Sequence, residues 1–100
     1  MIEYQYMVDF TLPEIITEEY KSLIPYQRAM VNQLFEDGKL ISYSLSMENQ
    51  KLWAIFIANS ELDVMDILAD MPLTPFMKTN ISLLTFHNTL EVAPPHFSLN

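Results

Sequence analysis

Residues 40–58 read LISYSLSMENQKLWAIFIA, and two strands with a turn between them account for this pattern. Residues 40–47 alternate between apolar side chains and serines, and a period of two predicts a strand with two different faces. Residues 51–58 are apolar on both faces, which is typical of a central strand. The polar residues between them, 48–50, predict the turn.

A strand and a helix precede this pair. Residues 2–10 alternate between aromatic or β-branched and polar residues, which predicts a strand. Residues 17–37 carry apolar side chains at helical spacing, with Thr17 as the expected N-cap. Gly38, the only glycine, follows where a helix would end in a left-handed residue. Pro25 lies inside this segment, so we expect it to kink the helix or to split it.

A second helix and a last strand follow the pair. Ser60 and Asp63 have the spacing of a capping box, so Ser60 is the expected start of the helix. The apolar positions expected to face the core are Leu62, Met65 or Val64, Leu68 and Ala69. Pro72 ends this helix, and residues 78–87 are expected to form the last strand.

The resulting order, strand-helix-strand-strand-helix-strand, predicts an α+β, ferredoxin-like fold. In this fold a four-stranded antiparallel sheet carries both helices on one face, so the other face is uncovered. Half of the 100 residues are hydrophobic, and a domain of this size cannot bury them all. We therefore expect the open face to pair with a second copy, in a homodimer or a larger ring. The alternative is that surface apolar residues are scattered singly.

The length of the chain allows one small domain. We place this domain at residues 1–88 and a C-terminal tail at residues 89–100. The tail holds the apolar residues Leu90, Val92, Phe97 and Leu99, so we expect it to pack on a neighbouring subunit.

Composition excludes several classes of function. Thirteen acidic residues against five basic ones give a net charge of −8, which argues against nucleic acid as a partner. The absence of cysteine removes thiolate chemistry and cysteine-ligated metals. No apolar run reaches the ~20 residues that span a bilayer, so no membrane partner is expected. The first residues lack the basic start of a signal peptide, and a cytoplasmic protein is therefore expected.

Three segments resemble the muconolactone isomerase family. The first is Ala69-Asp-Met-Pro-Leu-Thr-Pro-Phe-Met-Lys78, followed by a strand that ends at His87. The others are Asp9-Phe-Thr-Leu-Pro13 and Asp37-Gly38-Lys39. The resemblance implies a ferredoxin-like domain whose sheets pair into a dimeric α+β barrel. It also implies a cofactor-free proton shift in a small unsaturated lactone that carries a carboxylate, in bacterial aromatic catabolism.

The sequence departs from this family at the residues expected to move the proton. Counted from Gly38 and Lys39, the positions of the family's acid–base glutamate and histidine hold Gln27 and Ser42. A glutamine cannot take up a proton at neutral pH, and an isolated serine carries protons poorly. The family's isomerisation by the same groups is therefore not expected, and no catalytic residue is assigned.

The candidate pocket consists of polar residues that could face a shared cavity, together with aromatic residues: Gln27, Arg28, Ser42, Ser44, Trp53, Phe56 and Lys78. The serines would join it only if their strand face meets the helix; otherwise they face solvent or a wet dimer seam. Arg28 could clamp a carboxylate or pair with a surface acid, and Lys78 could hold its segment, contact a ligand or face solvent. His87 and His96 have no recognised metal spacing, so no metal is expected. The resemblance, whose reaction is cofactor-free, implies that no cofactor is needed.

Two hypotheses about function follow from these residues. The first is a muconolactone isomerase-like enzyme, a cofactor-free isomerase that acts on a small lactone or carboxylated metabolite through altered residues. The second is a non-catalytic, oligomeric domain that binds a small ligand or serves in assembly. The replaced acid–base pair favours the second hypothesis, and the family resemblance favours the first.

Overall fold

The structure, a computed structural model, describes residues 3–88. Its elements are β1 (Tyr4–Thr11), α1 (Glu18–Glu36), β2 (Leu40–Ser46), β3 (Lys51–Ala58), α2 (Glu61–Asp70), the 3₁₀ turn η1 (Thr74–Phe76) and β4 (Lys78–Leu83). This order confirms the predicted ferredoxin-like arrangement. The predicted tail, residues 89–100, lies outside the described residues.

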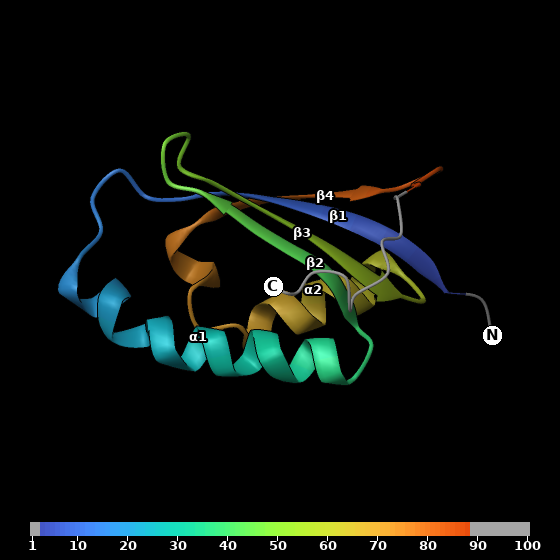
Figure 1. The fold of residues 1–100 in the computed structure, drawn as a ribbon, viewed down its shortest axis with the longest axis horizontal. Coiled ribbons are helices and arrows are strands. Elements are labelled where there is room, and N and C mark those ends of the chain that lie inside the picture. The colour runs from blue at the N-terminus through green and yellow to red at the C-terminus, as the bar shows by residue number, and fades with distance from the viewer. Residues whose placement is uncertain (1–2, 89–100) are drawn as a thin grey trace, which may run out of the picture.

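The four strands form one antiparallel sheet in the order β2-β3-β1-β4. The two helices lie on the same side of this sheet, with α1 running beneath β2 and β3 (Figure 1). No helix of residues 3–88 lies on the opposite side, which we name the open face (Figure 1). The sequence predicted this arrangement correctly, including the central position of β3.

The core lies between the sheet and the helices. β3 divides as predicted, since Leu52, Ala54, Phe56 and Ala58 are buried on the side that shares the core cluster with α1 and α2. Trp53, Ile55 and Ile57 alternate with these residues and so belong to the open face. The core residues of the neighbouring strand β1 are Tyr6, Val8 and Phe10.

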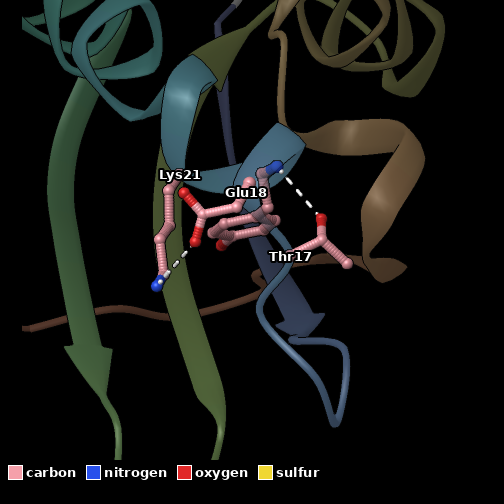
Figure 2. Close-up of polar contacts among 4 residues, drawn as sticks. Thr17, Glu18 and Lys21 are labelled. Carbon is pink, nitrogen blue, oxygen red and sulfur yellow. Dashed lines mark hydrogen bonds and ion pairs between the residues drawn. The ribbon is translucent and has the colours of Figure 1, made fainter.

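Helix α1 begins at the expected N-cap. The side-chain oxygen of Thr17 accepts a hydrogen bond from the backbone nitrogen of Tyr20 at 3.2 Å, and Figure 2 shows this contact beside the Lys21–Glu18 ion pair. The helix continues without interruption past Pro25, so the expectation that it splits there was wrong. Pro25 and Lys21 are both exposed, so the carbonyl group of Lys21 that loses its helical partner can bind water instead.

The end of α1 is closed by Gly38, as predicted. Its φ of 72° lies in the left-handed region. The backbone nitrogen of Gly38 donates to the carbonyl of Phe35, and that of Lys39 donates to the carbonyl of Leu34 at 2.9 Å. These two bonds form a Schellman motif, which turns the chain from α1 into β2.

Two predicted details of the C-terminal half were wrong. Ser60 caps α2 as expected, and two of the expected apolar positions, Val64 and Leu68, are its buried residues. The other expected positions are exposed: Leu62 at 64%, Met65 at 50%, and Ala69. One helical turn separates Val64 from Leu68, so a single narrow face is enough to cover the sheet. β4 ends at Leu83 instead of residue 87, because its one neighbour, β1, pairs with it only as far as Tyr6 and Leu83.

No helix among the described residues is both long and apolar enough to cross a membrane.

Candidate functional site

A cavity of about 460 Å³ lies between α1 and the edge of the sheet that β2 forms. We name it the α1–β2 cavity. It is lined by Leu12, Ile16, Tyr20, Ile24, Gln27, Arg28, Val31, Asn32, Phe35, Tyr43, Leu45, Met47, Leu52 and Leu73. Most of these side chains are apolar, so the polar groups among them determine which hydrogen bonds an occupant could make.

Gln27 is the buried polar residue of this cavity. It lies on the face of α1 that meets the sheet, and only 4% of its surface is exposed. Its Oε1 accepts a hydrogen bond from the backbone nitrogen of Leu73 at 3.1 Å, and its Nε2 donates to the hydroxyl oxygen of Tyr43 at 3.1 Å. The side chain therefore connects α1 to β2 and to the segment that follows α2.

Two tyrosine side chains line the cavity, and the hydroxyl group of one of them, Tyr43, contacts this amide. Burial raises the pKa of Tyr43, while its hydrogen bond from Gln27 acts in the opposite direction. Burial also raises the pKa of Tyr20, and the nearby phenol of Tyr43 adds to this shift. The Tyr20 hydroxyl group donates to the sulfur of Met77 at 4.0 Å. Both phenols are therefore neutral at neutral pH.

The mouth of the cavity combines one cation with exposed apolar side chains. Arg28 and Asn32 reach it from the exposed side of α1. Within residues 3–88, Arg28 forms no ion pair, so its guanidinium group is free to meet an anion there. Leu45 and Met47, at the end of β2, are 57% and 60% exposed beside it.

The structure brings together two of the residues named from the sequence, Gln27 and Arg28. Ser42 and Ser44 pair with Ile55 and Trp53 across β2 and β3, which puts them on the open face with Trp53. The serines face away from the helices because Tyr43 and Leu45, which alternate with them, line the cavity.

The remaining two candidates lie elsewhere. Phe56 is fully buried in the core and does not line the cavity. Lys78 is exposed at the start of β4, opposite Thr11 of β1. Neither side chain lines the cavity that contains Gln27.

A sequence model of the muconolactone delta-isomerase family matches residues 2–89. The chain belongs to this family. The resemblance found in the three sequence segments is therefore confirmed for nearly the whole domain.

Solved structures of known proteins show the same fold. A crystal structure of muconolactone isomerase superposes with a TM-score of 0.69 and 18% sequence identity, covering 89% of this chain and 96% of the other. The crystal structure of MtbAldR gives a TM-score of 0.57 and 13% identity, covering 93% of this chain and 60% of the other. A comparison with curated protein sequences gave no match.

Sequence reasoning missed two residues of this cavity, Tyr20 and Tyr43. Tyr20 lies among the apolar side chains of residues 17–37 and Tyr43 alternates with the serines of residues 40–47, so neither was named as a candidate. Their hydroxyl groups were the available signal, because a phenol on a core-facing position usually finds a polar partner.

The described lining of the cavity contains few ionisable groups. Among residues 3–88, no side chain that lines the cavity is a carboxylate, an imidazole or an ammonium group. Over residues 3–88, no group of three or more histidine, aspartate or glutamate side chains could hold a metal ion. The polar groups that residues 3–88 contribute to the cavity are thus the amides of Gln27 and Asn32, two neutral phenols and the guanidinium group of Arg28.

Proposed function

We propose that this member of the muconolactone isomerase family binds a small, largely apolar molecule in the α1–β2 cavity. The observation that carries this proposal is the cavity itself, about 460 Å³ of apolar lining around the Gln27–Tyr43 hydrogen bond. Binding sites for small molecules commonly have this size and combine an apolar wall with a few fixed polar groups.

Binding without proton transfer fits the polar groups better than catalysis does. A proton shift at carbon needs a base with a pKa near the working pH. Gln27 has no such pKa, and the raised pKa of both phenols keeps Tyr20 and Tyr43 protonated at neutral pH.

We infer that the ligand is a small lactone or carboxylated metabolite. Its apolar part would contact the wall formed by Ile24, Val31 and Leu52. A carboxylate would lie at the mouth, where Arg28 can form a charge-assisted hydrogen bond. The net charge of −8 disfavours anions over the surface as a whole, so this arginine supplies the local attraction.

A titration with a matched pair of variants tests the binding site. Acetophenone, a small apolar ketone, is added to the ¹⁵N-labelled protein, and amide shifts are followed by NMR. Leu45→Trp fills the cavity mouth and should weaken saturable binding at least about tenfold, a loss of about 1.4 kcal/mol. Ile41→Trp introduces the same side chain on the same strand outside the cavity lining and should bind normally. Absence of saturable binding, or equal binding by both variants, contradicts the proposal.

The family match favours a second candidate, a cofactor-free isomerase of a small lactone. The test is to incubate muconolactone in deuterated water with the wild type and, separately, with Gln27→Glu, and to measure exchange of the ring protons. Gln27→Glu is included because it restores a carboxylate at the cavity. Exchange of a ring proton by the wild type would support the isomerase. If neither protein exchanges a ring proton, the isomerase candidate is excluded for this chain.

We further propose that the chain assembles with itself through the open face. Met7, Trp53, Ile55 and Ile57 form an apolar centre on adjacent strands, because Met7 pairs directly with Ile55. Polar residues surround this centre, including the Asp9–Lys51 ion pair at 3.0 Å. An apolar centre with a polar rim is the usual anatomy of a protein interface.

The mass in solution tests this assembly. Light scattering should give a dimer or a larger ring for the wild type and a monomer for Ile57→Lys. The control is Leu62→Lys, an exposed apolar position on α2 at the far side of the sheet, which should not change the mass. A monomeric wild type rules the proposal out.

A further inference from the structure

The hydrogen bonds around Gln27 have a direction that the backbone fixes. The nitrogen of Leu73 belongs to a peptide group, so it can only donate, and the atom of Gln27 that faces it must be the amide oxygen. The other end of the amide is then the NH₂ group, which can only donate to Tyr43. No alternative orientation of the Gln27 side chain satisfies both contacts.

The hydroxyl proton of Tyr43 therefore points elsewhere. Its oxygen accepts from Gln27, and within residues 3–88 the Tyr43 hydroxyl group has no acceptor of its own. The neighbouring phenol differs, because the Tyr20 hydroxyl group already donates to Met77. Tyr43 lines the cavity, so its O–H is a hydrogen-bond donor that the buried part of the wall offers to an occupant, beside the second N–H of Gln27.

We propose that the α1–β2 cavity selects ligands that carry a hydrogen-bond acceptor, such as a ketone, lactone or carboxylate oxygen, which accepts from the hydroxyl group of Tyr43. This selection rests on the proposed binding function and specifies the chemical class of the ligand. Tyr43 contacts the ligand, and Gln27 is a positioning residue that acts through Tyr43.

Reversing the chain of hydrogen bonds should reverse the preference. In Gln27→Glu, the ionised carboxylate can accept from the nitrogen of Leu73 with one oxygen and from the hydroxyl group of Tyr43 with the other. The hydroxyl group of Tyr43 then donates its hydrogen bond to the carboxylate within the protein. Only the lone pairs of the Tyr43 oxygen face the cavity. The variant should consequently prefer ligands that donate.

Three probes of nearly equal shape separate these effects. Acetophenone accepts a hydrogen bond, cumene has a methyl group in place of the carbonyl oxygen, and 1-phenylethanol both donates and accepts. In Tyr43→Phe, the affinity of acetophenone relative to cumene should fall about five- to tenfold, the value of one neutral hydrogen bond. The ratio of two affinities in the variant is compared with the same ratio in the wild type. This comparison cancels the different hydrophobicity of the probes, and it also cancels any change in the cavity that weakens all probes equally.

Gln27→Glu supplies a second readout, measured at about pH 8.5, well above the ordinary pKa of glutamate. The affinity of 1-phenylethanol relative to acetophenone should rise several-fold. A merely structural role of Gln27 would weaken all three probes equally and leave the ratios unchanged.

The outcomes distinguish this inference from the function on which it rests. If the wild type binds none of the probes, the binding function fails, and the selectivity fails with it. If the probes bind but Tyr43→Phe and Gln27→Glu leave the ratios within about twofold of the wild type, a difference too small for a hydrogen bond, the inference alone is overturned.

Discussion

The Nε2 atom of Gln27 lies 3.1 Å from the hydroxyl oxygen of Tyr43, so an amide of helix α1 meets a phenol of strand β2 inside an otherwise apolar cavity. The same glutamine accepts a hydrogen bond from the backbone of Leu73, which makes one buried side chain the junction of three segments. Buried side chains that form such hydrogen bonds fix the relative position of the segments that they join. Removal of a hydrogen-bond partner from such a group lowers the stability of the protein.

Replacing Gln27 by leucine should destabilise the protein by about 1–3 kcal/mol, because the buried nitrogen of Leu73 loses its acceptor. Urea unfolding measures this change. Gln33→Leu is the matched control on the same helix, where the exposed side chain donates to Asp37. The control should change stability by less than about 0.5 kcal/mol, and equal losses in both variants would contradict the role given to Gln27.

Stability should fall as the pH rises above 10.0, the ordinary pKa of tyrosine, because Tyr20 and Tyr43 have a raised pKa in the folded chain. Above pH 10.0 the unfolded chain loses its phenol protons first, so it binds fewer protons than the folded chain. The stabilisation that the two phenols contribute is complete below pH 10.0. It is lost as the pH rises through the pKa values that the phenols have in the folded chain.

Tyr43→Phe should make this alkaline decline less steep, and urea unfolding at a series of alkaline pH values measures the slope. Tyr26→Phe removes an exposed tyrosine from α1 and should leave the slope nearly unchanged. An identical decline in wild type and Tyr43→Phe would show that burial of this phenol does not influence alkaline stability.

Gly38→Ala should cost about 1 kcal/mol, because the left-handed backbone at the end of α1 disfavours a Cβ atom. A Cβ atom there would meet nothing within 4 Å, so the cost is conformational and not a steric clash. Gly38→Asn should cost less than Gly38→Ala, since asparagine tolerates this conformation. Thermal unfolding of both variants provides the comparison, and an asparagine as damaging as alanine would argue against this origin.

Removing either helix cap should cost about 1 kcal/mol. Thr17 and Ser60 each accept a hydrogen bond from the first turn of their helix, at 3.2 Å in both cases. Ser22→Ala serves as the control, because its exposed hydroxyl group donates to a carbonyl within α1 and caps no helix end. Losses for Thr17→Ala and Ser60→Ala no larger than for Ser22→Ala would mean that the caps do not anchor the helices.

Local patterns were sufficient to predict the fold. The alternation in residues 40–58, the caps at Thr17 and Ser60 and the single glycine at position 38 each act over one turn or one strand, and each was confirmed. The split considered at Pro25 does not occur, because a lost helical hydrogen bond is costly only where water cannot replace it, and this position is exposed.

The composition of the site was harder to predict, because it depends on contacts between distant segments. Gln27 was named as a candidate pocket residue, but its partners at Leu73 and Tyr43 lie 46 and 16 residues away. A one-residue irregularity between Leu40 and Ser42 also shifts the register of β2. Periodicity describes which side a residue faces, and it does not describe which residues meet there.

The most direct test of the α1–β2 cavity as a ligand site is to observe the contacts of a bound small molecule. Nuclear Overhauser effects between the methyl group of acetophenone and the side chains of the labelled protein measure these contacts. We predict effects to Val31 and Leu45, which line the cavity from the helix and from the sheet. Effects to Trp53 and Ile55 of the open face instead, or no intermolecular effect at saturating acetophenone, would contradict the proposed site.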